Sequence, residues 1–380
     1  MSNNKRVVVA CDSFKGTMSA SEVCIIIKNA LCDKDPSLEV ITVPVADGGE
    51  GTVDCFHAAL GGRIIHTEVS SPLMRAVDAS WWLSDDGEVA VIEVAQASGI
   101  NTDGGDKDAL SATSYGTGEL ILAALDMGVR RFFIGLGGSA TTDGGTGILR
   151  ALGTRFVDAR GDTINHGGAA LNYLDYIDLT NLDPRLSECE FTALCDVTNE
   201  LYGENGAAYV FSPQKGADTE EKMVVLDSGL RRFADVCRKQ NIQGYEFHTG
   251  AGAAGGIGFG LMTFLNAKLK SGIDAILELT DFENITKDAF CVITGEGKLD
   301  LQTFSGKVPM GVVKKSHALY NIAISGLCEV EKSKITELGF DGVYETNPQH
   351  LPFEQIKPTC REDLYATAKS INLAFDGQTV

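Results

Sequence analysis

Alternating strand and helix segments at both ends of the chain constrain the fold more than any other feature. Val7–Cys11 is a short apolar run typical of a buried strand, and Ser19–Leu31 follows with the apolar spacing of a helix. Leu38–Val45 and Thr52–Leu60 repeat this order. Because strands that alternate with helices form parallel sheets covered by helices, the sequence predicts an α/β domain.

The alternation stops at Gly61-Gly62 and returns near the end of the chain. Residues 63–86 carry apolar side chains at nearly every second position, which is typical of antiparallel strands. From Ala289 onward, short apolar runs again alternate with helical ones. We therefore predict a discontinuous doubly wound domain built from residues 1–62 and 286–380, with residues 63–285 inserted as a second α/β domain.

The charge of the chain excludes several classes of partner. The formal net charge is −20, which repels nucleic-acid phosphates and anionic lipids, so we expect no nucleic-acid partner and no membrane partner. No apolar run approaches the length of about 20 residues that a membrane span needs, and no signal peptide is recognisable. The ten cysteines include no CxxC pair and favour reduced thiols. We predict a cytoplasmic protein.

Two loops follow the first two predicted strands and carry charge beside glycine. Asp12–Gly16 offers a lysine and an aspartate for phosphate and for metal or hydroxyl contacts, although a solvated capping turn explains it equally well. Ala46–Thr52 places three glycines beside two carboxylates, ahead of a helix N-terminus that attracts anions. The alternative for this second loop is an ordinary βα turn.

A third loop, Gly135–Gly145, is rich in glycine and hydroxyl groups and follows a short apolar run. Its small residues and backbone N–H groups are suited to cradle phosphate, and the alternative is a flexible linker. It lacks the GxxxxGK[ST] pattern, so a P-loop fold is not supported. Gly250–Gly258 either faces a ligand or serves close helix packing.

Two further segments place charge after predicted strands. Thr294–Lys307 concentrates charged and polar side chains in what we predict to be one loop, and such a density of charge is costly unless it serves a ligand. Asp196 follows another predicted strand and is weakly specific. The six histidines show no metal-binding spacing, and no GxSxG nucleophile motif occurs.

Taken together, eight strings that span nearly the whole chain resemble the glycerate kinase family, which includes the bacterial glycerate 2-kinases. The chain departs from the family pattern at Glu200 and at Lys107–Ala109. The strings are 12–17, 45–52, 115–121, 137–145, 195–199, 213–217, 253–258 and 294–300.

The resemblance implies a discontinuous flavodoxin-like domain with an inserted restriction-enzyme-like α/β domain. It also implies ATP and Mg²⁺ as cofactors and D-glycerate as acceptor, with 2-phosphoglycerate favoured over 3-phosphoglycerate as product. A homodimer is compatible with the sequence. The rival interpretations are another kinase of small hydroxy acids, a dinucleotide enzyme, and a non-catalytic nucleotide- or acid-binding protein.

Residue roles follow as hypotheses from the demands of phosphoryl transfer, which is mostly positioning and charge stabilisation. Asp47 or Asp196 would accept the proton of the acceptor hydroxyl, and Lys15 would contact phosphate or the glycerate carboxylate. Glu296 and Asp300, together with whichever of Asp47 and Asp196 is not the base, would bind Mg²⁺. The predicted phosphate-binding residues are Gly137, Gly138, Ser139, Thr141, Thr142 and Lys298. The predicted substrate-binding residues are Asp12, Ser13, Gly48, Gly49 and Glu50.

Overall fold

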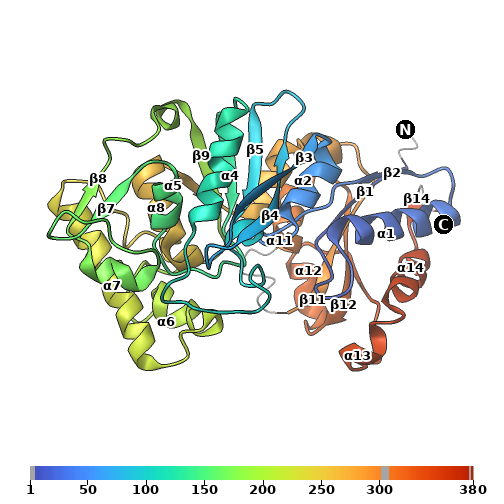
Figure 1. Cartoon of the computed structure of the whole chain (residues 1–380). Helices are drawn as coiled ribbons and strands as arrows, with labels where there is room; N and C mark the ends of the chain where they lie inside the picture. Colours follow the sequence, from blue (N-terminus) through green and yellow to red (C-terminus); the bar gives the residue numbers. More distant parts are fainter. Residues whose placement is uncertain (1–4, 301–307, 376–377, 380) are drawn as a thin grey trace. The chain divides into compact units, whose positions relative to one another are not determined.

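The computed structural model describes residues 5–300, 308–375 and 378–379 and divides into two compact α/β units. Unit 1 comprises Met1–Asp47, Asp54–Gly61 and Gly272–Val380, so the blue N-terminal and the orange-to-red C-terminal segments build one unit (Figure 1). Unit 2 comprises Gly48–Val53 and Gly62–Ser271. Residues 272–285, which we had predicted in the insertion, therefore pack within unit 1.

The reason for this difference is a close contact between two helices of unit 1. Gly311 of α11 (Val308–Lys315) lies so near α9 (Gly272–Leu279) that an added Cβ would stand 2.7 Å from Ile273 Cγ1. A single sequence does not reveal which distant helix an apolar helix will contact. The short helix α10 (Phe282–Thr286) follows in the same unit.

Unit 1 contains a five-stranded, fully parallel sheet in the order β13-β12-β11-β1-β2. Numbered along the chain within this unit, the order is 2-1-3-4-5, the flavodoxin-like arrangement. Ligands of such sheets bind beyond the carboxyl ends of the strands, where the strand order reverses, which here lies between β1 and β11. The strands are β1 (Arg6–Cys11), β2 (Glu39–Thr42), β11 (Cys291–Leu299), β12 (Tyr320–Cys328) and β13 (Gly342–Glu345).

Local sequence explains the first helix of unit 1. Helix α1 (Ala20–Lys34) begins after Ser19, whose side chain accepts a hydrogen bond from the backbone N–H of Glu22 at 3.2 Å. Ser19 is therefore the N-cap of this helix. The apolar face of α1 packs on the sheet, and α1 also contacts α14. The other elements are α2 (Thr52–Leu60), α12 (Lys332–Glu337), α13 (Phe353–Ile356), α14 (Cys360–Ser370), β14 (Ala374–Phe375) and β15 (Gln378–Thr379).

Unit 2 is built on a six-stranded mixed sheet in the order β10-β9-β6-β5-β4-β3. The first three strands in sequence pair antiparallel, as the alternating apolar pattern predicted, and the pairs from β5 to β10 are parallel. Trp81, Phe132 and Phe233 lie fully buried in its core. The strands are β3 (Arg63–Ser70), β4 (Ala76–Leu83), β5 (Val89–Glu93), β6 (Arg131–Gly135), β9 (Glu190–Leu194) and β10 (Lys268–Lys270).

The other elements of unit 2 surround this sheet. They are α3 (Val94–Ser98), α4 (Tyr115–Asp126), α5 (Thr146–Ala151), β7 (Arg155–Val157), η1 (Gly168–Tyr173), β8 (Tyr176–Asp178), η2 (Pro184–Glu188), α6 (Ala207–Phe211), η3 (Pro213–Lys215), α7 (Glu220–Lys239) and α8 (Ala253–Leu265). None of the helices in the described ranges combines the length and the apolar character needed to cross a bilayer. All ten cysteines are free thiols.

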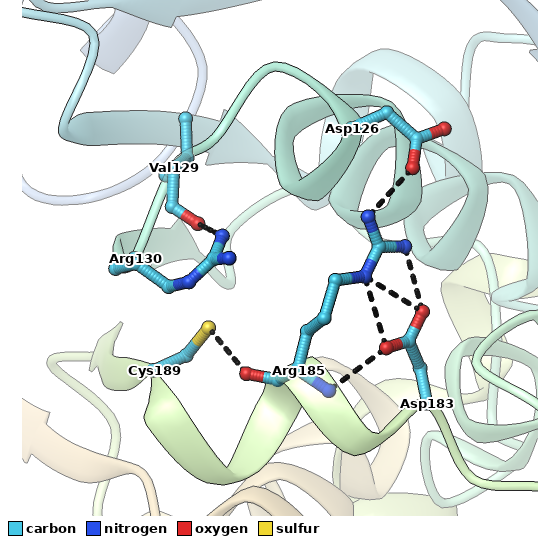
Figure 2. A network of polar contacts seen from close by, with 6 residues as sticks. All are labelled: Asp126, Val129, Arg130, Asp183, Arg185 and Cys189. Carbon is cyan, nitrogen blue, oxygen red and sulfur yellow. Dashed lines mark hydrogen bonds and ion pairs between the residues drawn. The ribbon is translucent and has the colours of Figure 1, made fainter.

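A charged network ties the end of α4 to the 3₁₀ helix η2, just before β9 (Figure 2). Arg185 donates to Asp126 at 2.8 Å and to Asp183 at 2.7 Å. The side chain of Asp183 also accepts from the backbone N–H of Arg185, and these bonds lower the pKa of Asp183. Because Asp126 is 70% exposed, this pair contributes little beyond fixing the local geometry.

The glycine run before and inside α8 serves close packing. Ala254, Gly255 and Gly256 adopt left-handed backbone angles, with φ of 52°, 70° and 91°. A Cβ on Gly255 would overlap the carbonyl oxygen of Thr141, and one on Gly256 would lie 2.9 Å from Gly144 Cα. This favours the packing alternative for Gly250–Gly258, because the run lies directly against the backbone of the Gly135–Gly145 loop.

We predict that Gly255→Ala lowers the free energy of unfolding by about 2–5 kcal/mol, because it adds left-handed backbone strain to a steric overlap with buried backbone. Gly87→Ala is the matched control, since Gly87 has φ of 76° and nothing within 4 Å of an added Cβ. It should cost only the backbone strain, about 1 kcal/mol. Urea denaturation measures both variants, and equal costs would contradict the packing role of Gly255.

Candidate active site

Three carboxylates and a lysine gather in unit 1 at the carboxyl ends of β1, β2 and β11. Asp12 directly follows β1, and Glu296 lies in the neighbouring part of β11. Asp47 follows β2, and its side chain lies 3.5 Å from Lys15 Nζ. The charges of the other three residues act on Asp12 and likewise on Lys15. The structure thus brings these four predicted site residues together where the strand order of the sheet reverses.

We call Asp12, Lys15, Asp47 and Glu296 the acid–lysine cluster. The electrostatics of the cluster centre on Asp12, which is 7% exposed. Burial, together with the charges of Asp47 and Glu296, raises the pKa of Asp12 to about 7. A 2.6 Å hydrogen bond from the Ser13 N–H and the charge of Lys15 oppose this rise. The pKa of Lys15 is raised, chiefly by Asp47. Asp12 can therefore gain or lose a proton near neutral pH, as an acid–base group requires.

A pH-dependent stability follows from the raised pKa of Asp12. Between the unfolded value of about 3.9 and the folded value of about 7, the folded protein binds more protons than the unfolded chain. The contribution of Asp12 to the free energy of unfolding should therefore fall as the pH rises through this interval, by about 4 kcal/mol at most. Denaturant titrations of the wild type and Asp12→Asn at several pH values should diverge in this way. A constant difference would contradict it.

A glycine- and hydroxyl-rich loop follows β6 in unit 2 and leads into α5. Gly138, Gly144 and Gly145 have φ of 74°, 67° and 79°, a region that favours glycine. Ser139, Thr141 and Thr142 are buried within the same loop. The hydroxyl oxygens of Thr141 and Thr142 are buried and have no hydrogen-bond partner among the described residues. We call residues 137–145 the phosphate loop, after the ligand that the sequence predicts for them.

Asp143 organises the phosphate loop from within. Its buried carboxylate accepts hydrogen bonds from the Ser114 N–H at 2.8 Å and the Ser114 hydroxyl at 2.9 Å. It also accepts from the N–H groups of Gly145 and Gly147 at 3.0 and 3.1 Å, and from the Thr113 hydroxyl at 3.4 Å. The carboxylate thus fixes the turn and the beginning of α5. The sequence places Asp143 in the motif, but no separate role was predicted for it.

Lys215 is a residue that sequence reasoning missed. It ends the 3₁₀ helix η3, is only 3% exposed, and donates to Ser139 Oγ at 2.8 Å and to the Thr141 carbonyl at 2.7 Å. Burial lowers its pKa to about 7, and the charge of Asp143 opposes that shift. Lys215 lies in the string 213–217 that resembles the family, but the sequence does not show that this lysine is buried.

Two predicted substrate residues also lie against the phosphate loop within unit 2. The Gly137 N–H donates to the Gly48 carbonyl at 3.4 Å, and a Cβ on Gly137 would stand 2.5 Å from Gly49 Cα. Gly48 has φ of 90° and approaches Leu194, so that a Cβ there would lie 2.9 Å from Leu194 Cβ. Only glycine permits this approach of two backbones. Glu50 is exposed in the same segment.

The predicted loop 294–307 is partly wrong. Strand β11 continues to Leu299 because it pairs with the long strand β12, as far as Leu299 with Cys328, so Glu296 and Lys298 lie in a strand. Lys298 forms an ion pair with Glu329 at 3.0 Å, which raises its pKa. Asp300 directly follows the strand. The remaining polar residues that were predicted here, Gln302, Thr303 and Lys307, lie outside the described residues.

Asp196 lies in unit 2 and is exposed just beyond β9, at the carboxyl end of the parallel part of that sheet. The acid–lysine cluster belongs to unit 1, and the phosphate loop belongs to unit 2. Each unit thus carries its own group of polar residues after strand ends.

The residues present fit a bound Mg²⁺ in the way that kinases use it. Among the described residues, no group of three His, Cys, Asp or Glu side chains is arranged to hold a metal. Mg²⁺ usually takes only one or two carboxylates from the protein and further oxygens from substrate phosphates and water. Burial raises the pKa of Asp12 most, and the negative charges of Asp47 and Glu296 raise it further; a cation would relieve this repulsion.

Comparisons with known proteins agree across nearly the whole chain. The model of the glycerate kinase family matches residues 7–375. The chain is 46% identical over 342 residues to glycerate 2-kinase of Escherichia coli K12, covering 89% of this chain and 90% of the relative. It is 44% identical over 369 residues to glycerate kinase of Bacillus subtilis 168, covering 96% of each.

A crystal structure from Salmonella typhimurium LT2, assigned as a glycerate kinase 2, superposes with a TM-score of 0.84 at 41% identity. The match covers 96% of each chain. The likeness therefore includes both units and is not limited to a shared fold class. The chain belongs to the glycerate kinase family.

Proposed function

We propose that this protein is an ATP-dependent kinase that transfers the γ-phosphate of ATP to D-glycerate, giving ADP and 2-phosphoglycerate. The family match over residues 7–375 carries this proposal, and the relative from Escherichia coli is named a glycerate 2-kinase. The geometry agrees with a phosphoryl transferase, because each unit places polar groups at the carboxyl ends of parallel strands. A cytoplasmic location and a homodimer stay predictions from sequence.

In this proposal the acid–lysine cluster handles the acceptor. Asp47 orients the glycerate hydroxyl and accepts its proton, and Asp12, with a pKa near 7, is a second group that can hold that proton. Lys15 pairs with Asp47 and attracts a phosphate or carboxylate oxygen. Asp196 is the alternative base, carried by unit 2. Ser13 keeps the Asp12 carboxylate oriented through its backbone N–H.

Glu296 and Asp300 are the carboxylates that would hold Mg²⁺. The ion would neutralise charge on the phosphate oxygens during transfer. Lys298 lies in β11, as Glu296 does, and forms an ion pair with Glu329. This exposed ion pair must open before Lys298 can contact a phosphate oxygen. Exposed pairs of this kind are weak, so the cost is small.

The phosphate loop holds the nucleotide. The backbone N–H of Gly138 and the side chains of Ser139, Thr141 and Thr142 provide donors, whereas the Gly137 N–H already donates to the Gly48 carbonyl at 3.4 Å. The two buried threonine hydroxyls without a partner support this assignment, since buried polar atoms are usually satisfied and an exception calls for a reason. Phosphate oxygens are acceptors that would satisfy them.

³¹P NMR of the reaction with ATP, Mg²⁺ and D-glycerate tests the proposed product. We expect a phosphomonoester resonance coupled to a single proton, as a phosphate on the C2 oxygen of glycerate requires. A resonance coupled to two protons would assign 3-phosphoglycerate and correct the product while keeping the kinase. No new monoester with the intact protein would overturn the proposed activity.

A further inference from the structure

We propose that Lys215 is a positioning residue of the phosphate loop: its buried ammonium group orients the loop and supplies the positive charge that balances a bound nucleotide phosphate. This inference rests on the proposed function, since it assigns the loop to ATP. It concerns unit 2 alone, because Lys215, Ser139 and Thr141 all belong to that unit.

The first support is the cost of burying this ammonium group. Lys215 is 3% exposed, and Asp143, the carboxylate that acts on it electrostatically, is not one of its hydrogen-bond partners among the described residues. It donates instead to two neutral oxygens, Ser139 Oγ and the Thr141 carbonyl. A buried charge without a paired counterion is costly and is found where function requires it. A phosphate group would be the missing counterion.

The second support is the geometry that these two bonds impose. The peptide between Thr141 and Thr142 is planar and trans, so its N–H points opposite to its carbonyl. Because Lys215 holds the Thr141 carbonyl, the Thr142 N–H is fixed in the opposite direction. The Ser139 hydroxyl, which accepts from Lys215, is left with its own proton to donate. Lys215 thus turns the loop into a set of oriented donors.

The third support is the pair of buried threonine hydroxyls in the same segment. Thr141 Oγ1 and Thr142 Oγ1 have no partner among the described residues. The neighbouring Asp143 accepts from the N–H groups of Ser114, Gly145 and Gly147 and bonds to neither hydroxyl. Two unsatisfied hydroxyls lie in the same loop as the Ser139 hydroxyl and the Thr141 carbonyl that the buried ammonium group contacts. An anion with several acceptor oxygens is the complementary ligand of such a loop.

The segment that carries Lys215 is itself held firmly. Lys107 Nζ donates to the Gln214 carbonyl at 2.9 Å, and Lys222 Nζ donates to the Gly216 carbonyl at 3.1 Å. Gly216 has φ of 105° and lies against Lys107. The charged groups around Lys215 are therefore Asp143 from the phosphate loop and these two lysines at its flanks. Burial disfavours the protonated form of Lys215, and the charge of Asp143 favours it.

Proton linkage distinguishes this role from a purely structural one. In the free protein, burial lowers the pKa of Lys215 to about 7, so that its charge is lost as the pH rises above that value. A bound phosphate favours the charged form, so ATP binding should be accompanied by proton uptake near pH 7.5. The affinity for ATP should then fall as the pH rises from about 6 to 9.

Isothermal titration calorimetry of MgATP binding, without glycerate and in buffers of different ionisation enthalpy, tests the inference. We compare the wild type with Lys215→Met, Lys215→Arg and the control Lys239→Met, an exposed lysine in the last turn of α7. The wild type should take up protons on binding. Lys215→Met should bind about tenfold more weakly or worse and lose the uptake that the wild type shows. Lys215→Arg, charged at every pH, should bind without the pH dependence, and Lys239→Met should behave like the wild type.

Two outcomes would overturn the inference. One is a wild type whose MgATP affinity is unchanged between pH 6 and 9, a result that needs no variant to fold. The other is a folded Lys215→Met protein, checked by circular dichroism, that binds MgATP as the wild type does. If either result is found while the NMR experiment still shows normal formation of phosphoglycerate, Lys215 does not have the proposed role. The proposed function would then still stand.

Discussion

Asp47→Asn is expected to lower kcat by a factor of about 10²–10⁴, the usual contribution of a positioned general base. Asp47 has the largest effect on the pKa of Lys15 and follows burial in its effect on Asp12. Its neutralisation should therefore also move the pKa of Asp12 downward, and the residual activity should persist to lower pH. Steady-state ADP release between pH 5.5 and 9 measures both effects.

The control for this variant is Asp54→Asn. Asp54 lies in the first turn of α2, only a few residues after Asp47, and is exposed. Its replacement should leave kcat within about twofold of the wild type. If Asp47→Asn also stays within that range, Asp47 is not the base, and Asp196→Asn becomes the deciding variant. A large loss for Asp196→Asn alone would move the acid–base role to unit 2.

Asp143→Ala should lower the free energy of unfolding by about 3–5 kcal/mol, because five hydrogen bonds converge on this buried carboxylate. Its removal leaves the donors of Ser114, Gly145 and Gly147 without an acceptor. Asp143→Asn retains one acceptor oxygen and should lose less. Urea denaturation followed by circular dichroism gives the free energies.

Asp158→Ala provides the comparison for the Asp143 variants. The Asp158 side chain also accepts from backbone N–H groups, those of Arg160 and Asp162 at 2.9 and 3.0 Å, but in an exposed turn where water can replace it. Its loss should cost about 1 kcal/mol or less. Equal costs for Asp143→Ala and Asp158→Ala would show that the phosphate loop does not depend on its internal carboxylate.

The sequence predicted most elements of the fold, because the signals that specify them are local. Each of these signals depends on residues that are only a few positions apart in the chain. Examples are the apolar patterns of α1 and β1, the N-cap at Ser19, and the alternating pattern of β3 and β4. The predictions failed where the length or the packing of an element depends on a partner that is distant in the sequence. Strand β11 extends to Leu299 because of its pairing with β12, and α9 joins unit 1 because of its contact with α11.

The candidate site was predicted in the same uneven way. Asp12, Asp47 and Glu296 could be grouped because the carboxyl ends of adjacent parallel strands meet at one edge of a sheet. The ion pair between Lys298 and Glu329 and the burial of Lys215 against Ser139 could not be foreseen, because they join residues 31 and 76 positions apart. The sequence states which residues are charged or polar, whereas their burial and their pairing depend on the packed structure.

The most direct measurement of the central claim is a coupled ADP-release assay with ATP and Mg²⁺ and a panel of small hydroxy acids. D-glycerate should raise the rate by about 10² or more over the rate without acceptor, and L-glycerate, lactate and glycolate should raise it far less. ADP release that is the same with and without D-glycerate, or faster with another acid of the panel, would contradict the account.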